Sequence, residues 1–151
     1  MSGVVSYDLF TSRLGTGGSG FTAEGGFYQT FINKTGANSI KGTIVSASLT
    51  TDDGVYTAPA NTIMPIGIIY ENGISDGSLV KVVVNGKAEV LLKNGLASSN
   101  GYWCGVSDTA GRMYQAATAP STTEHNREIG HSIEAVESGV DVLSMIVVHF
   151  N

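Results

Sequence analysis

Turn signals divide most of this chain into short segments, and their spacing restricts what the chain can fold into. From Phe27 onward, apolar runs are interrupted about every ten residues by a dipeptide in which Asp, Asn or Ser precedes Gly. The dipeptides are Asp53-Gly54, Asn72-Gly73, Asp76-Gly77, Asn94-Gly95, Asn100-Gly101 and Ser138-Gly139. Because such pairs favour tight turns between strands, the pattern predicts an all-β domain, either a small barrel or a sandwich.

The apolar runs between these turns predict where the strands lie. No segment of the sequence shows a convincing helical repeat, although Thr122 to Glu128 is compatible with one helical turn. The predicted strands are Gly26 to Ile32, Thr43 to Leu49, Met64 to Tyr70, Leu79 to Leu92, Tyr102 to Val106, Arg112 to Ala116, Glu128 to Glu134 and Val142 to Phe150.

The segment from Leu79 to Leu92 contains Asn85-Gly86, which is a strong hairpin signal. A two-residue turn there would place Val84 opposite Lys87, and so would put charged side chains on the face that carries the valines. The even-numbered residues of the segment are all small or apolar. We therefore predict one long strand that bends at Gly86, with the hairpin as the alternative.

The first 26 residues differ from the rest, and we assign them to an N-terminal arm, with a β-rich domain at residues 27–151. Residues 15–26 are rich in glycine and lack apolar periodicity, which predicts a flexible linker. Before them, Val4 to Phe10 alternates loosely, as a short strand would if another sheet offered it an edge.

The last predicted strand, Val142 to Phe150, carries apolar side chains at both odd-numbered and even-numbered positions, and so on both of its faces. Leu143, Met145 and Val147 alternate with Val142, Ile146, Val148 and Phe150. Such a strand needs partners on both faces. In a chain of 151 residues we expect one partner to be another copy or another protein, so this strand indicates assembly.

Composition excludes several classes of partner. The chain has 8 Lys and Arg against 13 Asp and Glu, a net charge of −5, and its cations are scattered, which argues against direct nucleic-acid binding. The single cysteine, Cys104, excludes an intrachain disulfide and suits a reducing compartment. We see neither a signal peptide nor an apolar run long enough to span a bilayer, so we expect no membrane partner.

Motifs that could carry chemistry lack their usual context. Gly15 to Gly20 matches G-x-G-x-x-G, but no buried strand precedes it and no crossover helix follows. No G-x-S-x-G motif occurs, and no histidine close in sequence marks Cys104 as a nucleophile, so a packed thiol is the favoured interpretation. We therefore predict no catalytic residue and no cofactor.

Histidines and carboxylates in the last third could form a metal site. His125, His131 and His149 could combine with Glu124, Glu128 or Glu134, since imidazole and carboxylate are common ligands. His131 and Glu134 have opposite strand parity, however, and His149 stands in an apolar strand without an acidic neighbour. The sequence favours hydrogen-bonded or surface histidines, and the expectation is no metal.

Five short motifs follow one another along the second half of the chain. They are Pro-Ile-Gly at residues 65–67, V-x-G-x-A-x-V at 84–90, S-x-x-A-G-R at 107–112, I-G-x-x-I-E at 129–134 and the ending at 147–150. As an ordered set over residues 65–151, they resemble the capsid decoration, or cement, proteins of tailed bacteriophages.

The resemblance implies a β-clip or β-tulip domain that sits as a homotrimer at three-fold or quasi-three-fold points on the outside of an icosahedral head. It would be made in the host cytoplasm, bridge neighbouring major capsid proteins and stabilise the capsid without catalysis. In this hypothesis the arm anchors are Val5, Tyr7, Leu9 and Phe10. The candidates for the trimer interface are Arg112, Leu143, Met145, Val147, His149 and Phe150.

Two other function classes stay open at this stage. One is a β-barrel module of a head or tail fibre that binds carbohydrate or a receptor through exposed Tyr102, Trp103 and Tyr114, although a core role is favoured for Trp103. The other is a small hydrolase, which would require an activity that survives Cys104→Ala or depends on one histidine.

Overall fold

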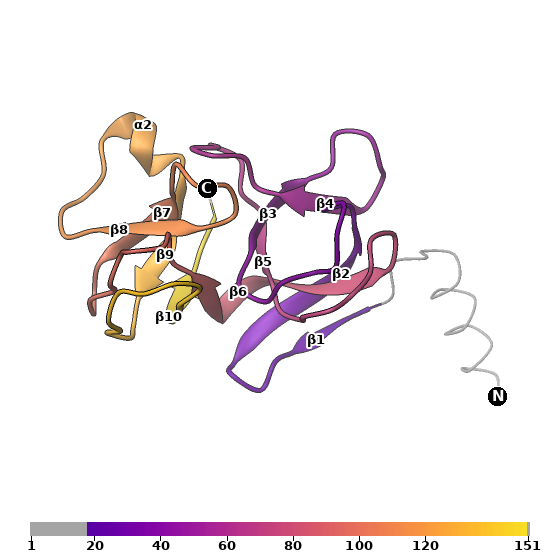
Figure 1. Cartoon of the computed structure of the whole chain (residues 1–151), viewed down its shortest axis with the longest axis horizontal. Coiled ribbons are helices and arrows are strands. Elements are labelled where there is room, and N and C mark those ends of the chain that lie inside the picture. The colour runs from indigo at the N-terminus through magenta and orange to yellow at the C-terminus, as the bar shows by residue number, and fades with distance from the viewer. Residues whose placement is uncertain (1–17, 151) are drawn as a thin grey trace.

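A computed structural model describes residues 18–150, and strands are its main regular elements (Figure 1). The predicted strand Val4 to Phe10, with the four arm anchors, lies outside the described residues. The strands are β1 (Ser19–Phe21), β2 (Gly26–Asn33), β3 (Ile44–Ala47), β4 (Gly54–Thr57), β5 (Gly67–Ile69), β6 (Leu79–Leu91), β7 (Trp103–Val106), β8 (Met113–Ala116), β9 (Glu128–Ser132) and β10 (Leu143–Val148).

The all-β class is confirmed, and each predicted strand from Gly26 onward corresponds to an observed one. The helical turn is α2 (Thr122–His125), where Ser121 and Glu124 form a capping box. Two strands were not predicted. β4 starts directly at Gly54, which had been assigned to a turn, and β1 lies within residues 1–26, which had been assigned to the arm.

The long strand β6 is confirmed as one strand, and the alternative hairpin at Asn85-Gly86 is wrong. Gly86 has a φ of 80° and lies directly opposite Gly26 of β2. A Cβ atom on Gly86 would lie 2.5 Å from the carbonyl oxygen of Gly25. Glycine is therefore required here both by the backbone conformation and by the close approach of β2.

The pairings join all ten strands in the order β1-β2-β4-β3-β5-β6-β10-β9-β7-β8, and an additional pairing joins β2 to β6. This pairing closes a ring of five strands, β2, β4, β3, β5 and β6. The ring is not an isolated barrel, because β6 continues past Gly86 and pairs with β10 in the other half (Figure 1). Among residues 18–150, no helix is long and apolar enough to cross a membrane.

Two hydrophobic cores lie on opposite sides of β3, β5 and β6, which contribute side chains to both. The smaller core holds Val45, Val55, Ile69, Val80 and Val82. The larger core holds Ile44, Ala58, Ile68, Val83, Ala88, Val90, Leu92, Cys104, Val106, Met113, Ile129, Ile146 and Val148. Neighbouring residues of β3, β5 and β6 enter different cores because successive side chains of a strand point to opposite faces. The ring and the second half are thereby packed as one body.

We expect Gly86→Ala to destabilise the protein far more than Gly73→Ala. Both glycines have a φ of 80°, but a Cβ on Gly73 would meet no atom within 4 Å. Gly73→Ala should therefore lower the free energy of unfolding by about 1 kcal/mol, the cost of the left-handed conformation alone. Gly86→Ala should cost about 3 kcal/mol or more, because β2 must also move. Urea unfolding measures both values, and equal losses would contradict the close approach at Gly86.

Candidate functional site

The terminal strand β10 has one buried face and one outward face. Ser144, Ile146 and Val148 are buried, whereas Met145 is half-buried and Val147 is 41% exposed. The predicted alternation is therefore correct. In the described residues, the inward side chains enter the larger core and the outward apolar side chains remain open to a further partner.

The outward side of β10 belongs to a wider surface, which we call the outer face and define by Trp103, His131, Ile133, Met145 and Val147. Val147 lies opposite His131 on β9, and His131 lies opposite Trp103 on β7, so these side chains form one row across three strands. Ile133 is 43% exposed and donates its backbone N–H to the carbonyl of Met145. Apolar residues that share one exposed sheet face are a common feature of protein interfaces.

Three of the six trimer-interface candidates also have partners within the chain. Arg112 donates to the carbonyl of Leu92 and pairs with Asp141, so its guanidinium holds the loop before β10. Leu143 lies opposite Leu91 on β6, and Phe150 packs against the larger core. Met145 and Val147 lie on the outer face, and His149 is exposed beside it.

The structure brings Glu128, His131 and His149 together at one end of the outer face. One ligand atom from each lies within 4.8 Å of the others. The carboxylate of Glu128 is only 1% exposed, and its two oxygens lie 2.6 Å from Nε2 of His149 and 3.0 Å from Nδ1 of His125. The rings of His131 and His149 are stacked with centroids 5.3 Å apart, and Trp103 covers His131 at 4.4 Å.

A β-bulge places Glu128 and His131 on the same side of the sheet. They are three residues apart, so a regular strand would point them to opposite faces. In β9, however, Gly130 pairs with Cys104 and Glu128 pairs with Gly105, which leaves Ile129 as an extra residue. Gly130 has a φ of 148°, and a Cβ there would collide with the backbone of Val147.

The sequence contains Glu128, His131 and His149 among the possible ligands, but a strict period of two in β9 places Glu128 and His131 on opposite faces, which the bulge reverses. The pairing of β10 with β9 then supplies His149, whose backbone N–H donates to the carbonyl of Ile129. Gly130 is the sequence feature that could indicate the bulge, since an isolated glycine inside an apolar strand often marks one.

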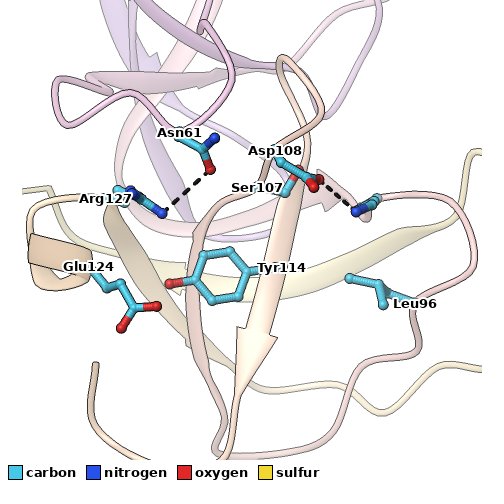
Figure 2. Close-up of a pocket in the computed structure, with 8 residues that line it drawn as sticks. Asn61, Leu96, Ser107, Asp108, Tyr114, Glu124 and Arg127 are labelled. Carbon is cyan, nitrogen blue, oxygen red and sulfur yellow. Dashed lines mark hydrogen bonds and ion pairs between the residues drawn. The ribbon is translucent and has the colours of Figure 1, made fainter. Parts of the chain in front are cut away.

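A separate open pocket lies between α2, β8 and the loop that follows β4 (Figure 2). Its charged groups already have partners within the chain: Lys93 lies 2.6 Å from Asp108, and Arg127 donates to Asn61. Lys93 lowers the pKa of Asp108 by hydrogen bonding. The ring of Tyr114 lies within the pocket (Figure 2). The hydrogen bond from Arg127 to Asn61 links the second half of the fold to the loop that follows β4.

Cys104 is a packed thiol, as the sequence suggests. It is 1% exposed in the larger core, and its Sγ accepts a weak hydrogen bond from Gln115. Burial raises the pKa of Cys104 to about 12, and the charge of Glu128 acts in the same direction. Since the thiolate is the nucleophilic form, this environment suppresses the reactivity of Cys104.

Comparisons with known proteins add a structural neighbour. No protein-family model and no curated protein matches the chain. The fold is similar to a crystal structure described as the head fiber gp8.5 N base in bacteriophage phi29. The two chains are 19% identical, the match covers 81% of this chain and 92% of that chain, and the TM-score is 0.57. A likeness at this identity establishes a similar fold.

We expect Cys104 in the folded protein to resist alkylation. At pH 8 a thiol with a pKa of about 12 is almost entirely protonated, so iodoacetamide should react at least about a hundredfold more slowly than with free cysteine. Mass spectrometry of timed samples measures the rate. In a Cys104→Ala background, Val140→Cys provides an exposed control that should react at the normal rate. Rapid native alkylation of Cys104 would contradict the buried environment.

Proposed function

We propose that this chain is a structural protein of a tailed-phage head, bound to the outside of the capsid as a homotrimer. In this proposal it occupies three-fold or quasi-three-fold positions, bridges neighbouring major capsid proteins and stabilises the head without catalysis. The observation that carries the proposal is the similarity in fold to a phage head fiber base, over most of both chains. The ordered motifs of the second half resemble capsid decoration proteins, which supports the same broad class, a structural protein of the phage head.

The outer face supports the assembly part of the proposal. Ile133 and Val147 are each more than 40% exposed, which leaves apolar surface in contact with water unless a partner covers it. We place the trimer interface on this face, with Met145, Val147 and His149 as its contributors from β10. The interfaces of a trimer are heterologous, so the outer face of one copy would contact a different surface of the next copy around the three-fold axis.

In this proposal the N-terminal arm makes the contact with the capsid. Val5, Tyr7, Leu9 and Phe10 would add a strand to the edge of a capsid protein's sheet, a mode in which backbone hydrogen bonds provide affinity and alternate side chains provide specificity. The described domain begins with β1, which pairs with β2. The arm therefore precedes β1 directly in the chain.

A receptor-binding module is the second candidate, because the similar structure is described as a fiber base. Its aromatic residues would be Tyr102, Trp103 and Tyr114, none of which is fully buried. Trp103, however, is already in ring contact with His131 and His125, which leaves less of its surface for a sugar. A glycan array that responds to the protein and loses its signal with Trp103→Ala, while the fold is retained, would favour this function over the capsid role.

Imaging tests the main proposal. Electron cryo-microscopy of heads assembled with and without this protein should show added density at three-fold or quasi-three-fold positions, with three copies at each. Heads that carry the protein should also release their DNA at a higher temperature. Absence of the density, or density at five-fold vertices alone, would overturn the proposed position.

Removing residues 1–17 should abolish binding to heads while leaving the domain folded. All strands of the described domain are retained in this variant, so its circular dichroism and melting temperature should match those of the full chain. Co-sedimentation with heads that lack the protein measures binding. Binding equal to that of the full chain would show that the domain, and not the arm, carries the capsid contact.

Val147→Glu should weaken trimer formation, whereas Val140→Glu should not. Val147 lies on the outer face, so the variant would place an unpaired carboxylate in the interface, at a cost of about 2 kcal/mol or more. Val140 is 74% exposed in the loop before β10 and provides a control of identical chemistry. Occupancy of heads at increasing protein concentration measures the effect. Equal shifts for both variants would place the interface elsewhere.

A further inference from the structure

We propose that Glu128, His131 and His149 form a binding site for a divalent transition-metal ion, zinc being the best match. The site lies within one chain, and the inference does not rest on the proposed capsid function. It draws its ligands from β9 and from the end of β10, where these strands pair.

The first argument is the environment of the Glu128 carboxylate. The side chain is 1% exposed, and neither oxygen accepts a hydrogen bond of good geometry from any described residue. The groups that lie close to the oxygens are imidazole nitrogens, of His149 at 2.6 Å and of His125 at 3.0 Å. A buried carboxylate needs a compensating positive charge, and a metal ion ligated by His131 and His149 would provide it.

The second argument is spacing. Ligand atoms around a tetrahedral zinc ion lie about 3.3 Å apart, given metal–ligand bonds of about 2.0 Å. The three ligand atoms here lie within 4.8 Å of one another, and the imidazole of His149 is 45% exposed, so a small side-chain rotation would bring them to this spacing. The bulge at Gly130 fixes the other two ligands on one side of the sheet.

The third argument is ligand chemistry. Two imidazoles and one carboxylate suit zinc, and also nickel and copper, whereas calcium and magnesium prefer sites made of oxygen ligands. The exposure of His149 leaves the metal open to solvent on one side. The fourth position would be filled by water or by His125, whose ring is also half-exposed and adjacent to Glu128.

Trp103 is not a ligand, but its ring packs against two of the imidazoles at the site. Its ring lies 4.4 Å from that of His131 and 6.2 Å from that of His125, so it restricts the orientation of both imidazoles. Residues that fix the orientation of a ligand commonly raise metal affinity, because less motion is lost on binding. Trp103 is the positioning residue of the proposed site.

Calorimetric titration of untagged full-length protein with zinc chloride, after treatment with EDTA, tests the proposal. We expect one zinc ion per chain with a micromolar or tighter dissociation constant, and a higher melting temperature in its presence. Cobalt should give the visible absorption of a four-coordinate site, and calcium should not bind. Absence of zinc binding at millimolar concentration would overturn the proposal.

Variants show whether the named residues form the site. His149→Ala and Glu128→Gln should each weaken zinc binding at least about tenfold and alter the cobalt spectrum. His149→Ala removes an imidazole that lies 2.6 Å from the buried carboxylate, so the metal-free variant should melt at a lower temperature, and zinc binding is compared well below that temperature, where both proteins are folded. Glu128→Gln removes the buried charge itself. Glu124→Gln is the control, because this exposed carboxylate binds Ser121 instead. Zinc affinity that is unchanged in His149→Ala, or reduced as much in Glu124→Gln, would place the ion elsewhere.

Discussion

The bend of β6 at Gly86 is the constraint on which the rest of the structure depends. Before the bend, β6 pairs with β2 and closes the five-stranded ring; after it, the same strand pairs with β10 and begins the second half. Val80 and Val82 enter the smaller core, and Ala88 and Val90 enter the larger one. A hairpin at this point would break the link between the two cores, so one continuous strand holds them together.

Much of the fold could be predicted because its determinants are local. Turn dipeptides mark where strands end, and the placement of charges decided between a bent strand and a hairpin at Asn85-Gly86. The strands that were missed depend on tertiary pairing. β1 is short and contains Gly20, so it is held by the edge of β2 and not by an apolar pattern of its own, and β4 is held by parallel pairing with β2.

The candidate sites could be predicted only in part, for the same reason. The outward side of Met145 and Val147 follows from the period of two in β10, and the structure confirms it. The cluster around Glu128 depends on two features of strand pairing, for which Gly130 is only a partial signal in the sequence. One is the bulge that reverses the parity of β9 at Ile129, and the other is the pairing that brings His149 beside that strand.

The proposed interface and the proposed metal site meet at His149, and this proximity has a physical consequence. Covering the outer face with another copy would remove water from the imidazoles, which makes an uncompensated charge on Glu128 more costly. A bound metal ion would neutralise that carboxylate and fix His149 in one orientation. The outer face would then be less polar and more rigid before another copy binds to it. Binding of the metal should therefore favour assembly, and by thermodynamic linkage assembly should tighten metal binding by the same factor.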